Sequence, residues 1–179
     1  MPRALVLIDI QNDYFPGGAF PLVEPDEAAR VASQILEAFR DSGEPIFHIQ
    51  HVATEPDATF FKPGTPGVEI HPAVAPEGSE PVIRKASPNA FLGTSLQADL
   101  EAAGTKDLVV LGMMTSTCVD STVRAASDLG YSVTVAADAC AAPDLSFDGV
   151  DVPGAAVHAA FIAALRDSFA KIAMSHELI

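Results

Sequence analysis

The sequence lacks a surplus of basic residues. It has 10 Lys or Arg residues against 24 Asp or Glu residues, and the formal net charge is −14. This balance argues against nucleic acid or an anionic membrane surface as a partner, because both would repel a negatively charged chain. Although 49% of the residues are hydrophobic, no apolar stretch is long enough to span a bilayer. The first residues lead straight into an apolar run without signal-peptide architecture, so we expect a cytoplasmic protein.

Motifs for common cofactors and metals are also missing. The sequence has no CxxC pair, no HExxH motif, no Walker loop and no internal repeat. Its first apolar run ends in Asp9, where a dinucleotide-binding turn would have glycines. We therefore expect no cofactor. The two cysteines, Cys118 and Cys140, fall in different predicted elements, and reduced thiols are expected in a cytosolic chain.

Apolar runs and amphipathic helices alternate along the 179 residues. Residues 4–8 are typical of a strand buried on both faces of a parallel sheet. A helix is expected from Pro25 or Asp26 to Ser42, with Gly43 ending it. Because this alternation continues to the last residues, it predicts a single domain over residues 1–179, with a parallel sheet and helices on both faces.

Three chemically complementary residues follow predicted strands. Asp9 and Lys85 end two strands, and Cys118 begins a predicted helix after a third. Ligands of parallel sheets bind beyond the carboxyl ends of the strands, so these residues are expected to share one site. Because a helix N-terminus favours negative charge, we expect the pKa of Cys118 to be lowered, which would make it a nucleophile. Cys140 lies among small apolar residues and is interpreted as a packing residue.

A long segment rich in Pro and Gly, residues 53–80, separates two predicted strands. Loops of this length are more often functional than idle. Its adjacent phenylalanines, Phe60 and Phe61, are expected to be exposed, either as a lid or pocket wall or as a packing or dimer contact.

The histidines do not form a predicted metal site. His48 and His51 are three residues apart on a strand and therefore point to opposite faces. His71 lies beyond the long loop, and His158 lies beside the apolar stripe of a helix predicted near residues 152–169, so a structural role is expected for it. We expect no metal.

Three motifs carry a resemblance to a known family. Residues 7–15 (LIDIQNDYF), 85–94 (KASPNAFLGT) and 112–126 (GMMTSTCVDSTVRAA) are similar to segments of the isochorismatase-like cysteine hydrolases. That family includes isochorismatase, nicotinamidase and N-carbamoylsarcosine amidohydrolase. The resemblance covers nearly the whole chain, and it implies an α/β/α sandwich with a six-stranded parallel sheet of order 3-2-1-4-5-6. It also implies homodimers or homotetramers.

The resemblance implies roles for individual residues. Cys118 would be the nucleophile, Asp9 the general base and Lys85 their electrostatic partner, which agrees with the chemistry of these groups. The backbone N–H groups of Met114 and Cys118 would form the oxyanion hole, with a cis peptide between Met113 and Met114.

Departures from the patterns of individual family members narrow the expected substrate. Nicotinamidases carry a metal-binding Asp-x-His after the second strand, and residues 49–51 (IQH) lack that pattern. Isochorismatase proper works without a cysteine nucleophile, so Cys118 favours cleavage of a C–N amide bond through a thioester. The expected pocket residues of this metal-independent hydrolase are Gln11, Phe15, Phe60 and Phe61.

Three other functions compare less well with the sequence. A phosphatase with an Asp nucleophile would need a second Asp two residues after Asp9, and that position is Gln11. A vinyl-ether hydrolase of the isochorismatase type and a non-catalytic binding protein with a vestigial triad remain alternatives. The main expectation is a hydrolase that acts on a small molecule.

Overall fold

The computed structural model describes residues 3–179, so residues 1 and 2 of the expected domain lie outside it. Six strands form a parallel sheet of order β3-β2-β1-β4-β5-β8. Because β8 is the sixth strand of this sheet along the chain, the predicted order is confirmed. The strands are β1 (Arg3–Ile8), β2 (Ile46–His51), β3 (Val82–Lys85), β4 (Asp107–Met113), β5 (Ser132–Ala141) and β8 (Lys171–Ala173).

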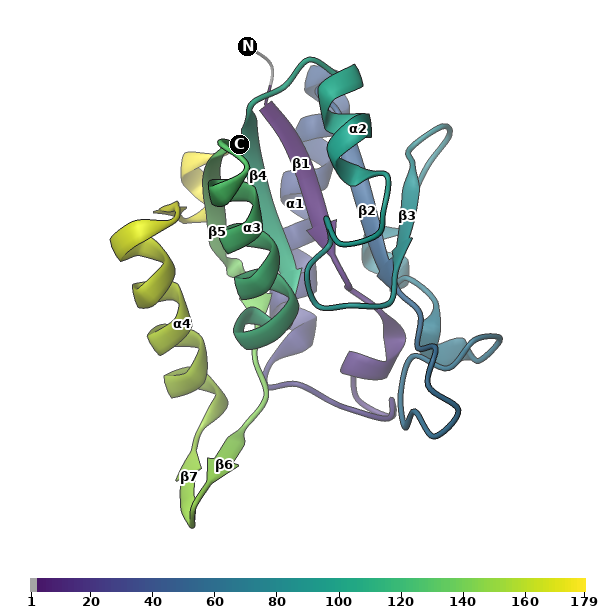
Figure 1. Cartoon of the computed structure of the whole chain (residues 1–179), viewed down its shortest axis with the longest axis vertical. Coiled ribbons are helices and arrows are strands. Elements are labelled where there is room, and N and C mark those ends of the chain that lie inside the picture. Colours follow the sequence, from purple (N-terminus) through teal and green to yellow (C-terminus); the bar gives the residue numbers. More distant parts are fainter. Residues whose placement is uncertain (1–2) are drawn as a thin grey trace.

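Helices cover both faces of the sheet, as predicted for a three-layer α/β/α sandwich (Figure 1). α1 lies behind the sheet in this view, whereas α2 and α3 lie in front of it, and α4 packs beside α3. Among residues 3–179, none of the helices combines the length and apolar composition that a membrane crossing needs. The helices are α1 (Pro25–Ser42), α2 (Leu96–Ala102), α3 (Asp120–Asp128) and α4 (Gly154–Ser168).

The hydrophobic core fills the space between the sheet and its helices. β1 is buried from Ala4 to Ile8, as its continuous apolar run predicts. α1 begins at Pro25, where the first turn needs no N–H donor, and ends at Gly43, whose left-handed φ of 68° suits glycine. Its apolar stripe faces the core through four buried side chains: Val31, Ile35, Leu36 and Phe39.

A hairpin between β5 and α4 was not predicted. β6 (Leu145–Phe147) and β7 (Val150–Val152) pair in antiparallel fashion and project from the body of the molecule (Figure 1). Asp148 and Gly149 connect them with φ angles of 49° and 77°. An Asp-Gly pair with two positive φ angles is typical of a two-residue type I′ turn. The hairpin explains why α4 begins at Gly154 and not near residue 152.

A close contact between two strands sets the position of the site. Ile8 of β1 and Gly112 of β4 are register partners. Gly112 has a φ of +128°, and a Cβ atom built on it would collide with the carbonyl oxygen of Ile8. Glycine is therefore required where β1 and β4 end. This contact brings Asp9, the residue after β1, beside the segment that leads to Cys118.

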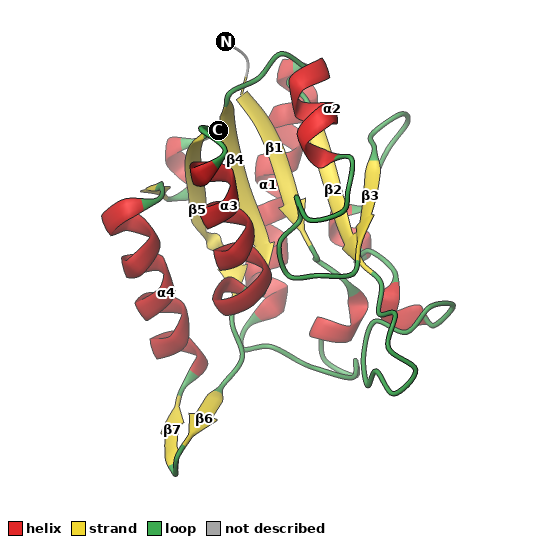
Figure 2. Cartoon of the chain, in the orientation of Figure 1, coloured by secondary structure: helices red, strands yellow, loops and turns green. Residues whose placement is uncertain are grey.

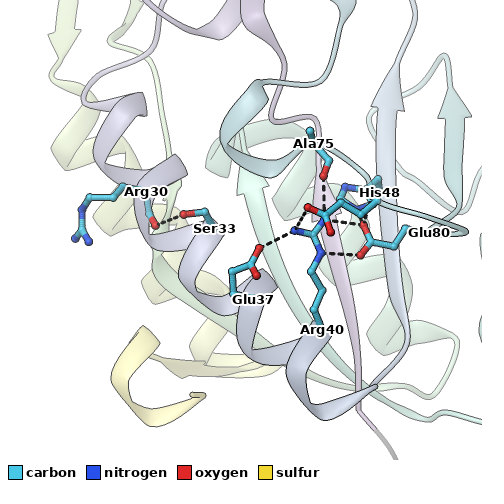
Figure 3. Close-up of polar contacts among 8 residues, drawn as sticks. Arg30, Ser33, Glu37, Arg40, His48, Ala75 and Glu80 are labelled. Carbon is cyan, nitrogen blue, oxygen red and sulfur yellow. Dashed lines mark hydrogen bonds and ion pairs between the residues drawn. The ribbon is translucent and has the colours of Figure 1, made fainter.

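An ion-pair network holds the segment that enters β3 (Figure 3). Arg40 of α1 binds both carboxylate oxygens of Glu80, at 2.8 and 2.9 Å. His48 Nε2 of β2 lies 2.9 Å from the same carboxylate, and the backbone N–H of Glu77 donates to it. These bonds, the Arg40 bonds foremost, lower the pKa of Glu80 to about 2. The network joins α1, β2 and the chain five residues before Lys85.

We expect Glu80→Gln to lower the free energy of unfolding by about 1–3 kcal/mol at pH 7, because a charged acceptor shared by Arg40 and His48 is lost. A carboxyl group whose pKa is lowered on folding contributes stability above its unfolded pKa, which is 4.5 for Glu80. The difference between the variant and the wild type should therefore shrink as pH falls from about 4.5 towards 2. Urea unfolding across this range measures it.

Glu77→Gln is the matched control, since the Glu77 side chain is 71% exposed and lies 3.5 Å from Arg40. An exposed pair of this kind contributes up to about 1 kcal/mol. Equal destabilisation by the two substitutions, or a Glu80→Gln effect that does not change with pH, would contradict the assignment.

Candidate active site

The three residues predicted to share a site are in contact with one another. The Lys85 ammonium lies 2.7 Å from Asp9 Oδ2 and 3.3 Å from Cys118 Sγ. All three residues are buried, with Asp9 at 0%, Lys85 at 4% and Cys118 at 3% exposure. Removing one partner of a buried ion pair leaves an uncompensated charge, so Asp9 and Lys85 depend on each other. The order of the strands therefore delivers the expected juxtaposition.

Asp9 follows β1 in an uncommon backbone conformation. Its φ is 49°, in the left-handed region that residues other than glycine rarely adopt. Its N–H donates to the carbonyl of Ile49 on β2, which extends the pairing of the strands by one bond. Backbone strain of this kind concentrates at functional sites. The sharp turn at the strand end carries the carboxylate towards Lys85 and Cys118.

Lys85 has two contacts besides Asp9 and Cys118. Its Nζ lies 3.0 Å from Nδ1 of His51 and 3.0 Å from the carbonyl oxygen of Ser87. His51 and Lys85 are register partners at the ends of β2 and β3. In the sequence, His51 stands out only in connection with a metal site, which its spacing from His48 disfavours. Its place in the site follows from strand register, and a single sequence carries little information about register.

The side chain of Gln11 holds the backbone of His51. Gln11 is fully buried, and its amide oxygen accepts from His51 N–H at 2.8 Å. Its amide nitrogen donates to the carbonyls of His51 and Val68, at 2.9 and 2.7 Å. Gln11 thus fixes the end of β2 and joins it to the long loop. Its role as a substrate-pocket residue stays a prediction.

Cys118 lies in a π-helical turn (Thr115–Val119) that directly precedes α3, and not in the first turn of an α-helix. The turn is anchored at Thr115, whose Oγ1 donates to Ala141 O and lies 3.0 Å from Nδ1 of His158. The contact with Thr115 agrees with the structural role expected for His158.

The peptide between Met113 and Met114 is cis, as the resemblance implies. The carbonyl oxygen of Met114 accepts from the N–H groups of Thr117 and Val119, which closes the turn around Cys118. The oxyanion-hole role of the N–H groups of Met114 and Cys118 stays a prediction.

The predicted lowering of the Cys118 pKa is wrong. Burial and the negative charge of Asp9 raise the pKa of this thiol, and the Lys85 ammonium offsets only part of the rise. Burial also raises the pKa of Asp9, while Lys85 lowers it. Desolvation disfavours every charged form, and it outweighs the effect of a nearby helix N-terminus. Burial therefore disfavours the charged forms of both Cys118 and Asp9, and the neighbouring Lys85 favours them.

Asp9, His51 and Cys118 form a set of donors that zinc accepts. One oxygen, one nitrogen and one sulfur atom from these side chains lie within 4.8 Å of one another. The Lys85 ammonium, however, contacts all three side chains. A divalent ion among them would meet that positive charge at close range. The donor set alone is therefore no argument for a metal centre, and metal independence stays a prediction.

The predicted pocket phenylalanines lie along two cavities. Phe60 and Phe61 line a cavity of about 290 Å³ together with His51. Phe61 is 1% exposed, so the expectation that both rings are exposed is wrong for it. Its N–H donates to Asp13 Oδ2, which fastens the loop to the chain that follows β1. Phe15 lines a second cavity, of about 690 Å³. Their contact with substrate stays a prediction.

The other candidates lie outside the triad. Cys140 is buried with its Sγ 3.4 Å from the carbonyl of Ala136, which agrees with a packing role. His48 contacts Glu80, and His71 stacks on Phe15 with 3.8 Å between ring centroids.

Comparison with known proteins agrees with this geometry. The model of the isochorismatase domain matches residues 3–177. The chain belongs to the isochorismatase family. It is 47% identical to an uncharacterized isochorismatase family protein of Bacillus subtilis, over 96% of each chain. It is 30% identical to the nicotinamidase of Escherichia coli, over 78% of this chain and 83% of that one.

A solved structure shows the same fold. The putative isochorismatase hydrolase of Oleispira antarctica superimposes with a TM-score of 0.95 at 46% identity, and the match covers 99% of this chain and 95% of that one. The protein is thus an isochorismatase-family hydrolase whose Asp9, Lys85 and Cys118 are clustered as a triad would be.

We expect iodoacetamide to modify Cys118 at least about tenfold faster than Cys140 near neutral pH. Burial raises the pKa of both thiols, so the difference is expected from their neighbours: Cys118 has a carboxylate and an ammonium beside its sulfur, whereas Cys140 donates to a backbone carbonyl. Lys85→Ala should slow the modification, because Lys85 lowers the pKa of Cys118. Intact-mass analysis with peptide mapping measures both rates. Equal reactivity of the two cysteines would argue against a thiol that the site activates.

Proposed function

We propose that the protein hydrolyses a C–N amide bond of a small molecule through a thioester on Cys118. The observation that carries the proposal is the position of the Lys85 ammonium, which contacts the Asp9 carboxylate and the Cys118 sulfur at once. A base, a cation and a nucleophile in mutual contact are the components that acyl transfer requires.

Each step of the proposed reaction uses a group at the site. Asp9 takes the proton of the Cys118 thiol while the sulfur attacks the carbonyl carbon, and Lys85 stabilises the sulfur as it becomes negative. The tetrahedral intermediate collapses when the C–N bond breaks, and the leaving amine takes the proton from Asp9. A water molecule then gives a proton to Asp9 and attacks the thioester, which releases the acid and restores the thiol.

The raised pKa of Cys118 is compatible with this sequence. A buried thiol beside a carboxylate stays neutral at rest, and proton transfer accompanies the attack instead of preceding it. The raised pKa of Asp9 makes this carboxylate a stronger base than an exposed aspartate. The family relationship supports an amide substrate, since one relative that is 30% identical is a nicotinamidase. Homodimers or homotetramers and a cytoplasmic location stay predictions.

We expect Cys118→Ala to lower kcat/KM for the best substrate by at least about 10,000-fold, because the nucleophile of the first step is lost. A panel of amides, ureides and isochorismate assayed on both proteins tests this. Activity on isochorismate that survives the substitution would favour the alternative vinyl-ether hydrolase. If both proteins are inactive on the whole panel and Cys118 resists alkylation, the alternative of a binding protein with a vestigial triad is favoured.

We expect full activity after exhaustive chelation, because the charge that stabilises the sulfur comes from Lys85 and not from a metal ion. The assay compares the dialysed enzyme with and without chelator, and metal content is measured in the same samples. Loss of activity that zinc restores would overturn the prediction and would direct attention to Asp9, His51 and Cys118.

A further inference from the structure

His51 connects the buried triad with a cavity at the surface. Its Nδ1 lies 3.0 Å from the Lys85 ammonium, on the inner side. The residue also lines the cavity of about 290 Å³ that Phe60 and Phe61 border, and its ring lies 5.6 Å from that of Phe61. His51 therefore lies between the triad and the cavity from which a small molecule could approach.

The contact with Lys85 fixes the protonation of His51. An ammonium group has three protons and no lone pair, so it can only donate. Nδ1 of His51 must accept, and the imidazole is neutral with its proton on Nε2. Burial and the charge of Lys85 lower the pKa of His51 to about 4, while Glu55 acts in the opposite direction. The ring is thus a neutral acceptor near neutral pH.

His51 itself is held rigidly. Gln11 binds its N–H and its carbonyl group with one side-chain amide. The strand pairing places it level with Lys85, at the end of the neighbouring strand. Because its backbone is fixed at both the N–H and the carbonyl, the His51 ring can accept from Lys85 only within a restricted region.

Without His51 and the Ser87 carbonyl, the Lys85 ammonium would have only Asp9 and Cys118 as neighbours among its contacts here. The attraction between Lys85 and the Asp9 carboxylate, at 2.7 Å, is stronger than that between Lys85 and a thiol at 3.3 Å. Without further contacts, Lys85 would be drawn towards the carboxylate and away from the sulfur. His51 and the Ser87 carbonyl bind the ammonium from other directions.

We propose that His51 is a positioning residue that keeps the Lys85 ammonium within reach of the Cys118 sulfur. The inference rests on the proposed function, because it assumes that Lys85 stabilises the sulfur as it becomes negative. It gives a role in the reaction to the half-buried His51 imidazole and to Gln11, which acts on the site through His51.

The test compares two substitutions with opposite designs. His51→Phe keeps a planar ring against Phe61 and removes the acceptor, whereas His51→Asn keeps an acceptor and removes the ring. The readout is the rate at which iodoacetamide modifies Cys118, with Cys140 as the internal reference. We expect His51→Phe to slow modification about tenfold, the effect of losing one hydrogen bond to a charged group. His51→Asn should stay within about threefold of wild type.

His176→Phe is the control, because His176 is an exposed histidine near the end of the chain. It should leave the rate unchanged. Modification of His51→Phe at the wild-type rate, or equal slowing of both His51 variants, would overturn the inference. Either result leaves the proposed function intact, whereas a wild-type Cys118 no more reactive than Cys140 contradicts the proposed function itself.

A measurement on the wild-type protein keeps the inference testable if His51→Phe does not fold. Nitrogen-15 NMR of the histidine side chains distinguishes the two neutral tautomers. We expect His51 to carry its proton on Nε2 at pH 7. A proton on Nδ1 would exclude the bond from Lys85 and would refute the inference.

Discussion

The site depends on one interaction, the buried ion pair between Asp9 and Lys85. Two charges without water are tolerated only while each stays paired, so any movement that separates them is strongly opposed. The third strand and the first strand of the chain are thereby tied together at their ends, although β2 lies between them. Cys118 lies against this pair, and the pKa of its thiol depends on how the opposite charges of Asp9 and Lys85 act at the sulfur.

Much of the surrounding structure serves to place that pair. Gly112 lets β4 approach Ile8, so that the chain carrying Cys118 passes close to Asp9. Gln11 fixes the end of β2, and the Arg40–Glu80 network holds the chain that enters β3 (Figure 3). These contacts come from α1, β1, β2 and β4. The positions of Asp9, Lys85 and Cys118 therefore depend on elements that are distant in sequence.

The alternation of apolar runs and helices predicted the parallel sheet, and a polar residue at the end of such a run has a defined place in it, so the clustering of Asp9, Lys85 and Cys118 could be predicted. The order of the strands came from the family resemblance. The partnership of His51 and Lys85 was missed, since it depends on register, and two strands of four to six residues do not specify a register. The sign of the Cys118 pKa shift was missed because burial is a property of the whole fold. The Asp148–Gly149 pair is a sequence signal for a two-residue hairpin turn, yet no hairpin was predicted there.

The raised pKa of the buried Cys118 thiol has a consequence for its oxidation. Peroxides attack thiolates much faster than thiols, and oxidation beyond the sulfenic acid is largely irreversible. Cys118 is 3% exposed, and burial raises the pKa of its thiol, so both properties slow attack by peroxides. The desolvation that disfavours the Cys118 thiolate therefore also protects the sulfur from oxidation.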